Sequence, residues 1–142
     1  MKIAIAQINP TIGAFRHNAA KIIAQAETAR GKGCDLVVFS ELAICGYPPR
    51  DLLDKPQFIA AGEACLDRLV QEIRGIGVIV GCVAPNSEPG GKPLHNTAVF
   101  FEDGQILQRV HKQLLPTYDV FDEHRHFEPG PPGSPFAYKG LQ

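Results

Sequence analysis

The stretch DLVVFSELAICGYPPRDLL, residues 35–53, indicates both the class of fold and the place of a site. Its first part, DLVVFS, is a short and almost continuously apolar run, typical of a strand buried on both faces in a sheet covered by helices. Glu41 follows directly, and Gly46, Pro48 and Pro49 then interrupt regular structure. A carboxylate at the end of a core strand, before an irregular loop, predicts a residue that is fixed there for a purpose.

The segments on both sides of this stretch predict alternating strands and helices. We expect a strand over residues 2–9, a helix over 16–32 that ends at Gly31 and Gly33, and a second helix over 56–74 with Pro56 in its first turn. A strand over 78–85, a turn-rich loop over 86–96, and strands over 97–101 and 105–111 around the tight turn EDG follow. This order predicts an α/β protein with a mixed sheet.

Length and composition limit the functions that we consider. With 142 residues and a formal net charge of -1, the chain has the size of one domain and no general attraction for nucleic acid or an anionic membrane. The first residues read as a strand and not as a signal peptide, and no run approaches the roughly 18 apolar residues of a membrane span. The four cysteines form no C-x-x-C pair, so we expect reduced thiols in a soluble, cytoplasmic protein.

Two charged residues occupy equivalent places in the predicted pattern. Glu41 and Lys112 each follow a strand directly, and each is followed by an unusual loop. Ligands of open α/β sheets bind at the carboxyl ends of strands that point the same way, so the pair is a candidate site; the alternative is two solvated strand-end charges. The loop that begins at Lys112 extends over some two dozen residues, and its aromatic residues favour an ordered, functional segment.

Three other motifs are weaker candidates. DEHRHFE, residues 122–128, contains metal-ligand residue types, but alternating charges of this kind more often form a local ion-pair cluster. GIGVIVG, residues 75–81, lacks the strand-before-helix context of a dinucleotide loop, and GxxxxGK[ST] is not present. Cys45 is more simply a small buried hydrophobe than a nucleophile. We therefore predict no metal site.

Several of these segments resemble the nitrilase, or carbon-nitrogen hydrolase, superfamily. The similar segments are VVFSELAICGYPPRDLL, HNTAVFFEDGQILQRVHKQLLP and MKIAIAQINPTIGAFRHN, which together extend over essentially the whole chain. More narrowly, GYPPRDLL and KQLLPTYDVFDEHRHFEPG resemble the glutaminase domain of glutamine-dependent NAD synthetases.

The resemblance implies an α-β-β-α sandwich of two mixed sheets between helices, and a Glu-Lys-Cys catalytic triad. Glu41 matches the general base, Lys112 the cation that stabilises the oxyanion, and Glu123 a second glutamate that positions Lys112. Tyr118 matches a residue that contacts the substrate, L-glutamine. The glutaminase step needs no cofactor. A synthetase domain would use ATP and Mg²⁺ to amidate nicotinic acid adenine dinucleotide, and a homo-oligomer is expected.

The sequence departs from the family pattern at the nucleophile. All four cysteines precede Lys112, whereas the family's cysteine lies on a later strand in a motif similar to ICED; a synthetase loop similar to SGGxDS is also not found. We therefore expect residues 1–142 to be the N-terminal portion of a glutaminase domain, with later strands and the synthetase domain elsewhere in a longer polypeptide, and to be inactive alone. The alternatives are a single-domain amidase of the superfamily and a truncated chain that serves only in binding or assembly.

Overall fold

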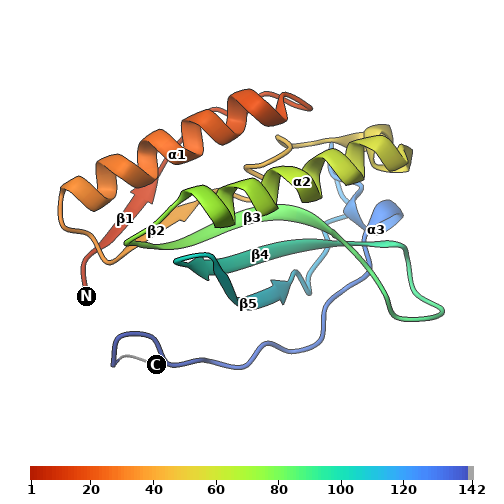
Figure 1. Cartoon of the computed structure of the whole chain (residues 1–142). Coiled ribbons are helices and arrows are strands. Elements are labelled where there is room, and N and C mark those ends of the chain that lie inside the picture. Colours follow the sequence, from red (N-terminus) through yellow and green to blue (C-terminus); the bar gives the residue numbers. More distant parts are fainter. Residues whose placement is uncertain (141–142) are drawn as a thin grey trace.

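A five-stranded mixed sheet forms the centre of the computed structural model, which describes residues 1–140 (Figure 1). The strands are β1 (Ile3–Ala6), β2 (Leu36–Phe39), β3 (Gly77–Pro85), β4 (Leu94–Glu102) and β5 (Gln105–His111), and they lie in the sheet in the order of the sequence. β1, β2 and β3 are parallel, whereas β4 and β5 each run antiparallel to the strand before them. The predicted α/β class and mixed sheet are confirmed.

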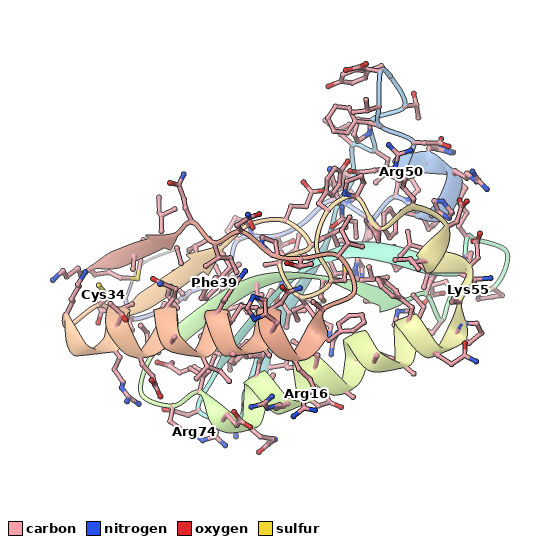
Figure 2. The ribbon with its side chains drawn as sticks, turned by 90° about the horizontal axis from the view of Figure 1, so that it is seen from above. Arg16, Cys34, Phe39, Arg50, Lys55 and Arg74 are labelled. Atoms are coloured by element: carbon pink, nitrogen blue, oxygen red, sulfur yellow. The ribbon has the colours of Figure 1, made fainter. Side chains whose placement is uncertain are left out.

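Two long helices cover one face of this sheet. α1 (Phe15–Gly31) connects β1 to β2, and α2 (Pro56–Glu72), which follows the short 3-10 helix η1 (Arg50–Asp54), leads to β3. Figures 1 and 2 show α1 and α2 side by side on the same side of the strands. Ile22 of α1 and Leu69 of α2 are fully buried in the same apolar cluster as Val78 and Val80 of β3. This cluster is the main core. Burial of such side chains stabilises the layer by about 1.5–3 kcal/mol each.

Most predicted boundaries are within two residues of the observed ones, and the differences have structural causes. β1 is shorter than the predicted strand over 2–9 because the four residues of β2 are its only partners in the described sheet. The observed loop between β3 and β4 is shorter than the predicted loop over 86–96, because β3 pairs with β4 as far as Pro85 and Leu94. The turn between β4 and β5 has Asp103 and Gly104 at positive φ, as a two-residue hairpin turn requires.

The long loop after β5 is ordered, as expected, and contains one short helix that the sequence did not predict. This helix, α3 (Glu123–His126), is followed by Phe127, which is only 2% exposed and forms a bridge with Leu94. Phe127 packs in a second apolar cluster with Leu42 and Leu53. The cluster therefore holds α3 against the loop that follows β2.

The sheet face opposite the helices is partly open. Ile3 and Ile5 of β1 are 50% and 80% exposed, while Phe136 and Tyr138 pack on Phe100 with ring centroids 5.2 and 4.8 Å away. Residues 1–140 thus form one helical layer and one sheet of the four layers expected for a sandwich. None of the helices within residues 1–140 combines the length and the apolar character of a membrane-spanning segment.

Candidate active site

The ends of β2 and β5 bring Glu41 and Lys112 together. β3 is parallel to β2, and two antiparallel steps through β4 make β5 point the same way. The carboxyl ends of both strands therefore lie at one edge of the sheet. Lys112 Nζ donates a hydrogen bond to Glu41 Oε1 at 2.8 Å. The two charged residues that the sequence indicated as a candidate site are therefore in direct contact.

The loop that carries Glu41 is packed directly on β3. A Cβ atom at Gly81 would lie 2.4 Å from the Leu42 nitrogen and 2.8 Å from Glu41 Cα, so only glycine permits this approach. The Ile44 N–H donates to the Gly81 carbonyl at 3.2 Å, and the Asn18 amide donates to the Ile44 carbonyl at 3.0 Å. These contacts fix the Glu41 backbone although the segment has no regular structure. The role of Gly81 could not be predicted from the sequence, since a single glycine in a strand does not indicate which backbone approaches it.

Lys112 is held by both neighbouring segments. Its backbone N–H donates to the Asn96 carbonyl at 2.8 Å, and its own carbonyl accepts from the Gly130 N–H at 3.0 Å. The side chain continues to Glu123 on α3, where Nζ lies 2.9 Å from Oε2 and 3.1 Å from Oε1. The ammonium group therefore bridges two carboxylates, one on each side of the site.

Glu123 is the buried member of the group. It is 5% exposed, and its Oε1 accepts a hydrogen bond from the Tyr47 hydroxyl at 2.8 Å. The Asn96 side-chain amide donates to Glu41 Oε1 at 2.6 Å and lies 3.5 Å from Glu123 Oε2. Tyr47 and Asn96 were not identified from the sequence. The only hint was their position within the segments that resemble the superfamily.

Electrostatics keep the cluster charged. Burial disfavours the charge of Glu41, but hydrogen bonds from Lys112 and Asn96 outweigh it, so the pKa of Glu41 lies below its ordinary value. Burial likewise opposes the charge of Lys112, but the contacts with Glu41 and Glu123 raise its pKa. Burial and the Glu123 carboxylate raise the pKa of Tyr47, so this hydroxyl remains a donor. The site therefore holds a carboxylate that can accept a proton beside a permanent cation.

Tyr118 lies apart from the charged cluster. It is 69% exposed, on a loop that projects from one end of the molecule, and its ring packs edge-on against Phe121 with centroids 5.6 Å apart. Phe121 in turn lies 6.2 Å from the Tyr47 ring. Phe121 therefore lies between Tyr118 and Tyr47, the residue that is hydrogen-bonded to Glu123. Its contact with substrate stays a prediction.

Two hollows flank the cluster. One, of about 430 Å³, opens on the sheet face opposite the helices, with Val38, Ile79 and Ala98 on its floor and Glu41 and Lys112 at its edge. The floor is apolar, so charge is concentrated on one wall of this hollow. A substrate that enters from the open face would therefore meet Glu41 and Lys112 at the end of the strands.

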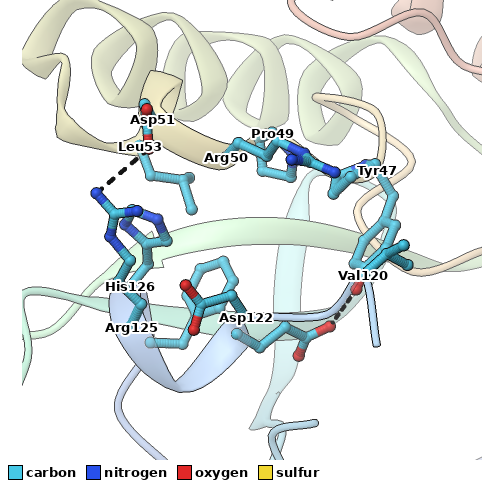
Figure 3. A pocket seen from close by; sticks show the side chains of 12 residues that line it. Tyr47, Pro49, Arg50, Asp51, Leu53, Val120, Asp122, Arg125 and His126 are labelled. Atoms are coloured by element: carbon cyan, nitrogen blue, oxygen red, sulfur yellow. Dashed lines mark hydrogen bonds and ion pairs between the residues drawn. The ribbon is translucent and has the colours of Figure 1, made fainter. Parts of the chain in front are cut away.

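The second hollow, of about 190 Å³, lies between η1 and α3 (Figure 3). Arg125 and His126 lie 3.4 and 3.5 Å from Asp51 and Asp54 across it. The expected local ion-pair cluster in DEHRHFE is therefore wrong: its charges pair with other segments and dock α3. Within residues 1–140, no three His, Cys, Asp or Glu side chains gather in a metal-binding arrangement.

Three of the four cysteines do not suit a nucleophile, because they are buried. Cys45, Cys65 and Cys82 are buried in the apolar clusters, and burial raises the pKa of Cys45 and of Cys82 to about 12. Such thiols stay protonated and unreactive at neutral pH. Cys45 Sγ lies 3.4 Å from the Gly46 carbonyl, which fits its interpretation as a small buried residue.

Comparison with known proteins decides the family. The sequence pattern of the family described as carbon-nitrogen hydrolase matches residues 2–140, almost the whole chain. The chain belongs to the carbon-nitrogen hydrolase family. The matched residues include the whole α/β layer and both Glu41 and Lys112.

The similar proteins within this family include NAD synthetases and amidases. The chain is 47% identical over 99% of its length to a glutamine-dependent NAD(+) synthetase of Synechocystis, and 43% identical over 98% to one of Xylella fastidiosa. A solved glutamine-dependent NAD+ synthetase of Acinetobacter baumannii superposes with a TM-score of 0.89 at 37% identity over 97% of the chain. The NitN amidase of Nesterenkonia sp. AN1 superposes with a TM-score of 0.79 at 25% identity over 99% of the chain.

The chain covers different fractions of these similar proteins. This carbon-nitrogen hydrolase chain spans 26% and 25% of the length of the two curated synthetases, and 26% of the solved synthetase chain. It spans 54% of the amidase chain. Most of the length of each synthetase therefore lies outside the matched region.

Proposed function

We propose that this chain carries the general base and the cation of a glutaminase site, within a glutamine-dependent NAD synthetase. The observation that carries the proposal is the Lys112 ammonium bound at 2.8 Å to Glu41 and at 2.9 Å to Glu123. The identity of 47% to a curated glutamine-dependent NAD(+) synthetase supports the choice of enzyme. The nucleophilic cysteine would come from outside residues 1–142.

In this mechanism, Glu41 accepts the proton of the cysteine thiol as the thiolate attacks the side-chain amide carbon of glutamine. The carbonyl oxygen becomes an oxyanion, and Lys112 stabilises its charge. Collapse of this tetrahedral intermediate breaks the C–N bond, the proton from Glu41 goes to the leaving nitrogen, and ammonia departs. Water then attacks the thioester with Glu41 again as base, which releases glutamate and restores the thiol.

The two carboxylates have different parts in this scheme because their environments differ. Glu41 has a side chain that is 43% exposed, and it faces the open hollow, where a proton can reach it. Glu123 is 5% exposed and is bound by both Lys112 and Tyr47. Glu123 therefore positions the ammonium group, and Glu41 exchanges the proton.

The ammonia would amidate nicotinic acid adenine dinucleotide in a synthetase domain that uses ATP and Mg²⁺, while the glutaminase step itself uses no cofactor. We place this homo-oligomeric enzyme in the cytoplasm. Tyr118, on the projecting loop, would contact the glutamine. The second candidate is a single-domain amidase, favoured by the fold similarity to the NitN amidase, 54% of which the chain spans. The higher identity to synthetases favours the first.

The test compares two nitrogen sources in the complete encoded protein. Glu41→Gln should abolish NAD synthesis from glutamine and leave synthesis from free ammonia intact, because only the ammonia source is lost. Glu27→Gln, an exposed change on α1, is the matched control and should affect neither. Equal loss of both activities in folded Glu41→Gln protein, or no ammonia-supported synthesis in the wild type, would contradict the proposal.

A further inference from the structure

Asn96 contacts three charged residues of the candidate site, although it is not charged itself. Its side-chain amide donates to Glu41 Oε1 at 2.6 Å and lies 3.5 Å from Glu123 Oε2. Its backbone carbonyl accepts the N–H of Lys112 at 2.8 Å. The residue is 4% exposed and lies near the start of β4. Within residues 1–140, no other residue forms hydrogen bonds with all three.

The contacts of Glu41 are unequal between its two oxygens. Asn96 Nδ2 and Lys112 Nζ both donate to Oε1, at 2.6 and 2.8 Å. Among residues 1–140 no side chain donates a hydrogen bond to Oε2. A carboxylate oxygen that already accepts two charge-assisted or short hydrogen bonds is a poor proton acceptor, whereas its unbound partner is a good one. The two donors therefore orient the carboxylate and select Oε2.

We propose that Asn96 is a positioning residue for the base. Its amide holds Glu41 Oε1 so that Oε2 faces the open hollow and takes the thiol proton. An amide suits this place because its NH2 group offers two donors and no charge, so it can lie between two carboxylates without neutralising either. This inference rests on the proposed glutaminase function, and it adds a requirement for a residue that touches neither the thiol nor the amide under attack.

The pH dependence of the reaction provides a readout that a purely structural role would not change. The titratable groups that face Asn96 are Glu41 on the loop after β2, Lys112 after β5, and Glu123 on α3, with Tyr47 bound to Glu123. The hydrogen bond from Asn96 is one of the contacts that lower the pKa of Glu41. Its loss raises that pKa, so the acid limb of glutamine-supported turnover moves to higher pH.

The experiment measures glutamine-supported and ammonia-supported NAD synthesis by the complete encoded protein from pH 3.5 to 9, a range that extends below the ordinary pKa of a glutamate. For Asn96→Ala we expect kcat with glutamine to fall about 10- to 100-fold, the loss of a hydrogen bond to a charged group, and the acid limb to rise by about one pH unit. Ammonia-supported kcat should change less than about twofold. An unchanged acid limb with normal glutamine turnover would overturn the proposal.

Two further variants keep the test decisive. Asn96→Asp has the same shape, so it replaces the alanine variant if that protein does not fold; its added negative charge should move the acid limb at least as far. Asn18→Ala removes another buried amide, which binds only backbone atoms, and should lower thermal stability without moving the acid limb. If Asn18→Ala moved the acid limb as far as Asn96→Ala, general loosening of the fold would explain the shift, and the assignment of Asn96 as a positioning residue would be wrong. If Glu41→Gln itself retained glutamine turnover, the proposed function would fail instead.

Discussion

Removal of the Lys112 ammonium should loosen α3, because it leaves two carboxylates facing each other without a cation. Glu123 is 5% exposed, so its unpaired charge cannot be solvated by water. Breaking a buried pair costs about 3–5 kcal/mol, and loss of an exposed pair about 0–1 kcal/mol. Lys112 is 29% exposed, and Tyr47 still donates to Glu123, so we expect an intermediate cost of about 2–3 kcal/mol for Lys112→Ala.

This cost is local and can be measured by amide hydrogen exchange in the complete protein. The amides of Glu123, Phe127 and Glu128 donate to Pro116, Glu123 and Leu94, so their exchange reports the undocking of α3. A cost of 2–3 kcal/mol corresponds to exchange about 30- to 150-fold faster over this segment. Amides of α1, remote from the site, serve as the internal control and should be unchanged.

A double-mutant cycle separates the charge effect from simple loss of contacts. Glu123→Gln removes the charge that Lys112 neutralises, so Lys112→Ala combined with Glu123→Gln should restore most of the protection of α3. Glutaminase activity should remain absent in the double variant, because the cation for the oxyanion is still missing. If the double variant exchanged as fast as Lys112→Ala alone, an unpaired buried charge would not be the cause of the loosening.

Four further outcomes follow from the same geometry. Gly81→Ala should cost more than about 3 kcal/mol in the free energy of unfolding, measured by urea titration, because its Cβ would lie 2.4 Å from the Leu42 nitrogen. Tyr118→Ala should raise the KM for glutamine and leave ammonia-supported kcat unchanged; an unaltered KM would remove this residue from the substrate site. Cys45→Ala should retain glutamine-supported kcat. Abolished glutamine turnover in the folded variant, with ammonia-supported turnover intact, would instead indicate that this thiol is the nucleophile. The pKa of Glu41 is lower in the folded protein than its ordinary value of 4.5, so the Glu41 charge stabilises the fold fully above pH 4.5. This stabilisation is lost as the pH falls through the lower pKa of the folded state. The melting temperature of Glu41→Gln should therefore depend less on acid pH than that of the wild type.

Elements with strong periodicity or punctuation could be predicted from the sequence. Pro56 begins α2 as expected, and the turn at Asp103 and Gly104 has the conformation expected from EDG. Glu41 and Lys112 were a candidate pair because each directly follows a strand, and the structure adds that two antiparallel steps make both strands point the same way. The local pattern was sufficient to identify these two residues because each directly follows a strand in the sequence.

The remainder of the site depends on contacts between distant segments, which local pattern cannot reveal. Asn96 lies 55 positions from Glu41, and Tyr47 lies 76 positions from Glu123. Helix α3 has four residues and no periodicity; it is stabilised by the burial of Phe127, by the ion pair of Arg125 with Asp51 and by the contact of His126 with Asp54. A short helix of this kind is determined by tertiary packing rather than by propensity.

The open sheet face and the chemistry of the site occur on the same side of the molecule. The hollow beside Glu41 has an apolar floor of Val38, Ile79 and Ala98, and this floor continues the face on which Ile5 is 80% exposed. Apolar surface of this kind is stabilised when another layer covers it. A segment that packs there would exclude water from Lys112 and bring a side chain within reach of Glu41 Oε2. Covering the sheet and completing the triad would therefore be one structural event, so a substitution such as Ile5→Asp on this face should reduce glutamine-supported synthesis while Glu41, Lys112 and Glu123 stay in place.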